Sequence, residues 1–466
     1  MMDQQGKVNR RAVVLGVGMA AAAATAGFAL RAGAGEPIRL RSRQTSYSFE
    51  GMQTHGLYSL QDAAPPPVLR MRQGVPVEIE VTNGVDEHTT MHWHGIRLPN
   101  AMDGVPYLTQ FPIAPGERFR YAFTPPDAGT YWYHPHCMTM RQMAYGLTGL
   151  LIVEEQDDPG FDADIPLNLK DFRLDAAGRL LPYFTPRGAA RGGTFGNLQT
   201  TNWQLNPRYD LPAGSLVRLR IAATDNTRVY RLMLPDIAGR VIAWDGHPLR
   251  DAIALPTAAD PLWLSPGQRV DIAVQMPDTE GREVTLAAVL GPTPKPLATL
   301  RAIGPSQGRD LAEIAPLPRN PVSEPDLSTA ERRSLVFGWS PDGAGQNNGF
   351  CGNSAYTFWS IDRQPWPGDA VSGTGAVATL SLGKTYIFKL QNESPNNHPI
   401  HLHGLALLPL RSNKRTLRQN WTDTILLMKG ETVEVAFKAD NPGDWAFHCH
   451  VIEHQKTGLA GYIHIG

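Results

Sequence analysis

Histidines carry most of the candidate chemistry of this chain. Ten of its 14 histidines lie in four short clusters, two near residues 90–136 and two near residues 398–454, and one cluster also contains a cysteine. Imidazole and thiolate are preferred ligands of copper and zinc, so the clusters predict metal binding by both ends of the chain. The clusters read His92-Trp93-His94-Gly95, His134-Pro135-His136, His398-Pro399-Ile400-His401-Leu402-His403-Gly404 and His448-Cys449-His450-Val451-Ile452-Glu453-His454.

Each cluster contains a His-x-His pair. Successive side chains of a β-strand alternate between its faces, so residues i and i+2 point the same way. Each pair is therefore expected to direct two imidazoles at one point, and the four pairs offer enough ligands for several ions. The pairs are His92/His94, His134/His136, His401/His403 and His448/His450.

Cys449 lies between two of these histidines and must point the opposite way, towards a second site. His398 and His454 are the remaining imidazoles of the clusters and can join it there. A His2Cys trigonal set with a weak axial position is the blue-copper arrangement. Structural zinc takes four ligands in a closed tetrahedron, which does not account for eight imidazoles and a separate His2Cys set.

The four motifs, in this order, resemble those of the multicopper oxidases, the family of laccase, ascorbate oxidase and bacterial cuprous oxidases. Residues 92–112, 129–150, 392–404 and 441–459 resemble the four copper segments of that family. The resemblance implies four copper ions. The type 1 (blue) copper would be held by His398, Cys449 and His454, the type 2 copper by His92 and His401, and the paired type 3 coppers by His94, His134, His136, His403, His448 and His450.

The resemblance also assigns roles to residues that do not bind copper. Leu459 occupies the axial position of the blue copper as a non-ligating residue, which favours a higher reduction potential. Asp103 matches an aspartate that supplies protons near the cluster, although Asp-Gly is also a common turn. Some relatives have a glutamate where this chain has Gln455, so a second carboxylate relay is not expected. Glu453 reads as a strand-end residue.

The rest of the sequence indicates an all-β protein. Glycine (45) and proline (39) are plentiful, and turn residues recur between short alternating segments such as 75–81 and 432–437, as in sandwiches or barrels. Further strands are expected at 147–154, 215–222 and 269–275. The resemblance implies three cupredoxin-like Greek-key β-barrel domains, which we place at residues 36–155, 156–315 and 316–466. The second contains no copper ligands and is expected to be a spacer.

Residues 1–35 are interpreted as an export signal. Arg10-Arg11 precedes an apolar stretch at 12–30, and Ala32-Gly33-Ala34 offers a cleavage site, which indicates twin-arginine export to the periplasm or outside the cell. A general secretory signal or an uncleaved anchor is the alternative. No other stretch is long and apolar enough to span a bilayer, so no membrane attachment is expected after cleavage.

For several residues the sequence permits more than one interpretation. Cys137 and Cys351 could form a disulfide in an oxidising compartment or remain two buried thiols. Met138, Met140 and Met143 could contact Cu(I) or pack beneath the copper sites. The isolated histidines His55, His88, His247 and His464 are assigned no role.

Three functions are compatible with this reading of the sequence. The first is laccase-like oxidation of phenols and other organic donors, with O2 reduced to two waters. The second is a metallo-oxidase acting on Cu(I), Fe(II) or Mn(II) in metal tolerance, and the third is a non-catalytic cupredoxin scaffold, against which the complete ligand set argues. The expected partners are O2 and a small reducing substrate. The protein is expected to be a monomer. The balance of 43 basic and 44 acidic residues gives no indication of nucleic-acid binding.

Overall fold

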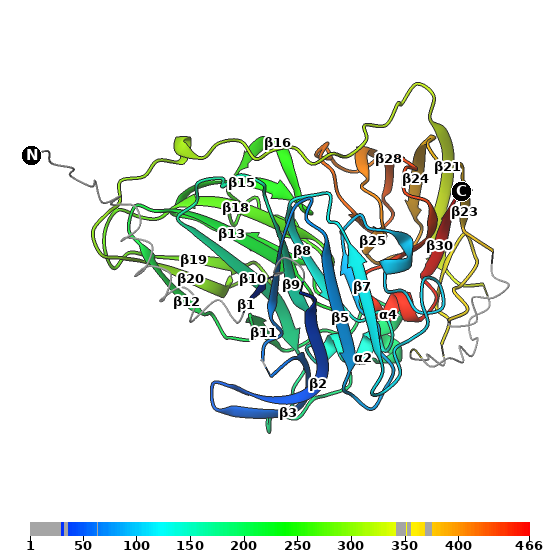
Figure 1. The fold of residues 1–466 in the computed structure, drawn as a ribbon, viewed down its shortest axis with the longest axis horizontal. Coiled ribbons are helices and arrows are strands. Elements are labelled where there is room, and N and C mark those ends of the chain that lie inside the picture. The colour runs from blue at the N-terminus through cyan, green and yellow to red at the C-terminus, as the bar shows by residue number, and fades with distance from the viewer. Residues whose placement is uncertain (1–28, 32–35, 63, 342–350, 352–355, 369–374) are drawn as a thin grey trace, which may run out of the picture.

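The computed structural model describes residues 29–31, 36–62, 64–341, 351, 356–368 and 375–466 (Figure 1). These residues form six β-sheets in three successive pairs, each pair a cupredoxin-like Greek-key barrel, which confirms the predicted all-β class. The chain passes from one pair to the next through residues 155–162 and 304–330, and the exact domain boundaries stay a prediction. In Figure 1 the middle pair (green) lies on the left and the third pair (yellow-green to red) on the right.

In the first pair of sheets, the alternation of apolar and polar residues determines which face of each strand is buried. In β5, Val77, Ile79 and Val81 are buried while the residues between them are partly exposed, so one face of the strand packs into the barrel. The first sheet contains β1 (Ala29–Arg31), β4 (Val68–Arg72), β9 (Gly149–Glu154), β8 (Gly129–His134) and β6 (His92–His94), and the second contains β3 (Met52–Leu60), β2 (Ile38–Phe49), β5 (Val77–Asn83) and β7 (Arg118–Phe123).

The middle pair has an apolar core of its own, and its strands β13 and β18 pack against β8 of the first pair. Its first sheet contains β11 (Leu198–Thr201), β10 (Ala163–Phe172), β13 (Leu216–Ala223), β18 (Arg269–Gln275), β15 (Ala238–Trp244) and β16 (His247–Ala254), and its second contains β12 (Arg208–Pro212), β20 (Lys295–Ile303), β19 (Glu283–Ala288), β14 (Tyr230–Met233) and β17 (Leu262–Leu264).

The third pair carries the C-terminal histidine clusters. Its first sheet contains β22 (Trp359–Ile361), β21 (Glu331–Trp339), β24 (Thr385–Asn392), β28 (Thr432–Lys438) and β26 (Leu408–Ser412), and its second contains β23 (Ala378–Leu380), β30 (Ala460–Ile465), β29 (Gly443–Cys449), β25 (His398–Leu402) and β27 (Thr424–Leu427). The helices within the described residues are η1 (Asn100–Met102), α2 (Thr139–Ala144), α3 (Pro186–Ala189), η2 (Leu311–Glu313) and α4 (Ile452–Lys456).

The five predicted strands are present, with shifted ends in four of them. The strand expected at 269–275 has those bounds, whereas the one expected at 75–81 begins at Val77, because Val75 lies in a turn and is 44% exposed. The other three differ by one or two residues at one or both ends.

The two ends of the chain share one continuous apolar cluster. It joins residues of the first pair, such as Trp93 and Tyr133, to residues of the third, such as Phe447 and Trp445, all of them buried. Burial of large aromatic side chains is a major source of stability. The sheets that carry the histidine clusters are therefore held together by packing as well as by any metal.

The expected export signal lies almost wholly in residues 1–28 and 32–35, outside the described residues. Ala29–Arg31 is described and forms the edge strand β1, which pairs in parallel with Val68–Arg70. Cleavage after Ala34 would remove this strand. Within the described part of the chain, no helix has the length and apolarity needed to cross a bilayer.

Candidate metal centre

The three residues expected to hold a blue copper lie together in the third pair of sheets. His398 begins β25, Cys449 ends β29 and His454 lies in α4. The Cys449 Sγ atom is 3.5 Å from His398 Nδ1 and 3.6 Å from His454 Nδ1, and the two nitrogens are 3.0 Å apart. All three side chains are fully buried. The three residues that the sequence predicts to hold a type 1 copper are therefore close together, and their binding of copper stays a prediction.

The protonation of this triad suits a metal cation. Burial raises the pKa of the Cys449 thiol far above its usual range and lowers the pKa of His454 to about 4. The imidazoles are therefore neutral, as ligands must be, whereas the thiol needs a nearby cation to ionise. The Val451 backbone N–H donates to Sγ at 3.4 Å, which also favours the thiolate.

Leu459 is fully buried in the same apolar cluster as Cys449. Its backbone carbonyl accepts a hydrogen bond from the Cys449 N–H at 3.0 Å. This bond places Leu459 next to Cys449, and its axial role stays a prediction.

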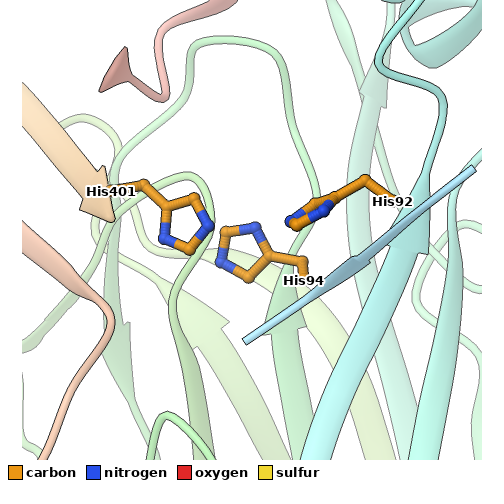
Figure 2. A group of neighbouring side chains, drawn as sticks. All are labelled: His92, His94 and His401. Atoms are coloured by element: carbon orange, nitrogen blue, oxygen red, sulfur yellow. The ribbon is translucent and has the colours of Figure 1, made fainter. Parts of the chain in front are cut away.

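The remaining eight histidines of the clusters form a second, larger group between the first and third pairs. Their nitrogens fall into overlapping sets of three, each set lying within 4.8 Å. Figure 2 shows one set, in which the His94 and His401 rings stack at a centroid distance of 3.9 Å. The sets are His92/His94/His401, His94/His134/His450 and His136/His403/His448.

The structure corrects the expectation that each His-x-His pair aims at one point. His134 belongs with His94 and His450, whereas His136 belongs with His403 and His448. The reason is that β8 ends at His134 and Pro135 turns the chain. The pairs His401/His403 and His448/His450 are also divided between different sets, whereas His92 and His94 share one set.

Unpartnered nitrogens show that this group fits metal ions. Buried polar atoms are normally hydrogen-bonded, yet six imidazole nitrogens here have no partner. In contrast, Nδ1 of His92, His401 and His134 is bonded to the carbonyl oxygen of Asp103 (2.8 Å), Asp423 (2.9 Å) and Pro135 (3.0 Å). Such bonds orient a metal-binding histidine and fix its tautomer. The unpartnered atoms are His92 Nε2, His94 Nδ1, His134 Nε2, His401 Nε2, His450 Nδ1 and His450 Nε2.

Asp103 lies against this group, as the sequence predicted. Its Oδ2 accepts from His403 Nδ1 at 2.8 Å, and its Oδ1 is 3.2 Å from His92 Nδ1. It is also a turn residue, because it follows η1 and precedes Gly104 (φ +79°), where a Cβ would strike the Met91 carbonyl oxygen. The turn holds the carboxylate between two candidate ligands.

Asp423 was missed by the sequence analysis. Its Oδ1 is 3.1 Å from His94 Nε2 and 3.3 Å from His401 Nδ1. Arg269, a fully buried residue of β18, bonds both carboxylate oxygens at 2.9 and 2.6 Å and lies 3.4 Å from Asp245 Oδ1. The pKa of Asp423 is held well below its usual range: burial opposes this, but Arg269 and the adjacent histidines outweigh it.

The middle pair is thus more than a spacer. Besides Arg269 it contributes Gly267, where a Cβ would lie only 3.1 Å from His450 Cδ2 and 3.2 Å from His94 Cε1. The Gly267 carbonyl accepts from Trp132 Nε1 at 3.3 Å. The sequence contains one signal for this role of the middle pair. Arg269 is a charged residue at the start of β18, a buried and otherwise largely apolar strand.

Glu453 is not a strand-end residue, because the chain forms α4 there. Its buried carboxylate accepts from Thr194 Oγ1 at 2.8 Å and the Thr185 N–H at 3.2 Å, and so ties the 185–194 segment to α4. Gln455 Nε2 lies 3.4 Å from His136 Nε2. Gln455, His136 and His448 line a cavity of about 50 Å³ beside the histidine group.

The structure also answers the questions that the sequence leaves open about the cysteines, the methionines and the isolated histidines. Cys137 and Cys351 form a disulfide, so the alternative of two thiols is wrong. Met140 and Met143 pack with Ile452 in an apolar cluster, in agreement with packing residues. The isolated histidines lie outside the candidate metal groups of the described chain: His55 bonds Ser46, His247 bonds Asn320, and His464 bonds Asp444.

Comparison with known proteins assigns the family. Models described as multicopper oxidase match residues 42–158 and 347–465. A crystal structure of a multi-copper oxidase from Pseudomonas thermotolerans is 40% identical, with a TM-score of 0.82, and the match covers 94% of this chain and 100% of that one. The chain belongs to the multicopper oxidase family, whose members are copper-dependent oxidoreductases that use O2.

Relatives within the family differ in the function that their names give. Laccase-2 of Fomitopsis schrenkii is 28% identical over 89% of this chain and 86% of its own length. The iron transport multicopper oxidase FET3 of Gibberella zeae is 26% identical over 85% of this chain and 70% of its own length.

Proposed function

We propose that this protein is a laccase-like oxidase that removes single electrons from aromatic organic donors and reduces O2 to two waters. The donor would be oxidised next to the site of His398, Cys449 and His454. Dioxygen would be reduced at the eight-histidine group, with the type 2 ion held by His92 and His401. The type 3 pair would be held by His94, His134, His136, His403, His448 and His450.

Copper bound at these residues would supply one-electron redox chemistry that links oxidation of the donor to reduction of dioxygen. The chain positions the two sites on one backbone segment, because Cys449 lies between His448 and His450. Burial keeps the imidazoles neutral and excludes water. Asp103, which bonds His403, would hold a proton beside the group where water is formed.

The surroundings of His398 and His454 support an organic donor. The Trp359 ring packs against both, at centroid distances of 5.0 and 4.8 Å. Within the described residues, the two imidazoles contact each other, Ser394 Oγ, the Arg191 carbonyl oxygen and Cys449 Sγ. The nearby Glu453 carboxylate is already bonded to Thr194. Among the described residues, neither imidazole bonds to a carboxylate or a methionine sulfur, and such an aromatic setting suits an aromatic donor better than a metal ion.

The test compares donors on one fully copper-loaded preparation. Steady-state rates with a phenol, Fe(II) and Cu(I) are expected to favour the phenol in kcat/KM. Cys449→Ser is expected to abolish the blue absorbance and every oxidase activity together. A wild-type protein that oxidises Fe(II) or Cu(I) faster than any phenol would identify a metallo-oxidase instead.

We also propose export by the twin-arginine route and a monomeric state. The paired arginines and the apolar stretch that follows them support export. Sequencing the N-terminus of protein from the periplasm and measuring its mass in solution would test both proposals. A protein retained in the cytoplasm, or a stable dimer, would contradict them.

A further inference from the structure

One exposed aromatic side chain is connected to the blue-copper residues. Trp339, at the end of β21, is 47% exposed. Its ring stacks on that of Trp359, with centroids 4.2 Å apart and planes inclined by 15°. Trp359 in turn packs against His398 and His454. Three aromatic layers therefore lead from the surface to the copper ligands.

The stack is held rigidly. Trp339 and Trp359 are directly opposite partners in the antiparallel pair β21–β22. The Trp359 Nε1–H donates to the Ala189 carbonyl at 2.7 Å, and its backbone N–H donates to the Thr457 carbonyl at 2.9 Å. These bonds fix the inner ring against both the 185–194 segment and α4.

The copper ligands themselves are closed to a donor. His398 and His454 are fully buried. The His454 Nε2–H donates to the Arg191 carbonyl at 2.5 Å, and His398 Nε2 bonds Ser394 Oγ at 2.7 Å. Glu453 holds the covering segment through Thr194. A phenol in contact with either imidazole would have to break this set of bonds.

We propose that Trp339 is the contact site for bulky, planar aromatic one-electron donors, including phenols attached to a polymer. The donor stacks on the exposed indole and loses one electron, and a phenol also releases one proton to water. Trp359 and the two imidazoles would carry this electron to a copper ion held by His398, Cys449 and His454, which would accept it, while neither indole is changed overall. The inference rests on the proposed oxidation of organic donors.

The test measures anaerobic bleaching of the blue absorbance by phenol-substituted dextran, a donor too large to pass the 185–194 segment. In Trp339→Leu the second-order rate constant is expected to fall by about two- to tenfold, the range that one aromatic stacking contact is worth. Trp339→Phe should retain part of the rate. Trp263→Leu is the matched control, because Trp263 is 38% exposed but lies in β17 of the middle pair.

Binding gives a second readout that does not depend on electron transfer. Calorimetry of the copper-loaded proteins with redox-inert methoxyphenyl dextran should show weaker binding for Trp339→Leu and no change for Trp263→Leu. Unchanged blue absorbance and reduction potential would show that the copper site is intact in each variant.

The outcomes separate this inference from the proposed function. Wild-type rates and wild-type binding in Trp339→Leu would overturn the contact site and leave the oxidase assignment standing. A wild-type protein that is bleached by Fe(II) but by neither free nor polymer-bound phenol would overturn both. Equal losses in Trp339→Leu and Trp263→Leu would also overturn the specific role of Trp339.

Discussion

The Arg269 guanidinium holds the Asp423 carboxylate through two hydrogen bonds of 2.9 and 2.6 Å. Asp423 in turn contacts His94 and His401, so a residue of the middle pair of sheets fixes two candidate ligands. Both charged groups are buried, and removing one partner of such a pair costs about 3–5 kcal/mol.

Arg269→Met is therefore expected to lower the ratio of copper to protein and slow O2 turnover, while the blue absorbance persists. Arg269→Lys keeps the charge but cannot bond both carboxylate oxygens in the same geometry. Its copper content and O2 turnover should therefore lie between those of wild type and Arg269→Met. Copper analysis with electron paramagnetic resonance would measure the loss. Arg250→Met, which breaks an exposed pair with Glu324, is the control. Full copper content in Arg269→Met would contradict this role.

Leu459→Met is expected to lower the potential of the blue site by adding an axial thioether donor, which stabilises Cu(II). Each tenfold change in relative affinity for the two oxidation states corresponds to about 59 mV. Redox titration measures the shift, with Leu380→Met, another buried leucine of the same core, as the control. A rise in the reduction potential, or no change in it, would mean that Leu459 is not axial.

Asp103→Asn is expected to slow steady-state oxygen turnover by roughly 10²-fold or more, the usual worth of a positioned proton donor. Asparagine can still accept the bond from His403 Nδ1, so anaerobic reduction of the blue site should be nearly unchanged. Stopped-flow bleaching and oxygen uptake measure the two steps separately. Normal oxygen uptake in this variant would leave Asp103 with a turn role alone.

Asp164 gives a pH dependence to the contact between the first and middle pairs of sheets. Burial alone would raise its pKa, but the positive charges of Arg220, Arg218 and Arg70 lower it to about 2 from 3.8. A carboxyl whose pKa is depressed by folding adds stability at pH values above its unfolded pKa, and this stability is lost as pH falls towards 2.

Asp164→Asn should therefore lower the free energy of unfolding by about 1–2 kcal/mol at pH 7, allowing for partial exposure. The difference from wild type should shrink between pH 4 and pH 2. Chemical denaturation of both proteins at each pH cancels the contribution of the histidines. Asp62→Asn, whose carboxylate is almost fully exposed, should show no difference, and a constant deficit for Asp164→Asn down to pH 2 would contradict the linkage.

The candidate copper ligands could be predicted because they lie in short sequence motifs. The three consecutive residues His448, Cys449 and His450 alone indicate two separate metal sites. Asp423 could not be predicted in this way, because its partner Arg269 lies 154 residues away and neither belongs to a motif. The grouping of His134 with His94 also depends on where β8 ends, which alternation alone does not fix. In the sequence Trp359 is indistinguishable from an ordinary core aromatic residue. Only the position of β22 in the fold shows that its ring packs against the imidazoles of His398 and His454.

The Cys137–Cys351 disulfide makes the covalent chain a closed ring with two tails. The ring, spanning a sequence separation of 214, contains the whole middle pair of sheets, and the tails carry every candidate copper ligand. A single cut by a protease anywhere between these cysteines would leave the two tails covalently joined beside His136. Under reducing conditions the same cut would divide the molecule into two separate polypeptides, each with half of the eight-histidine group.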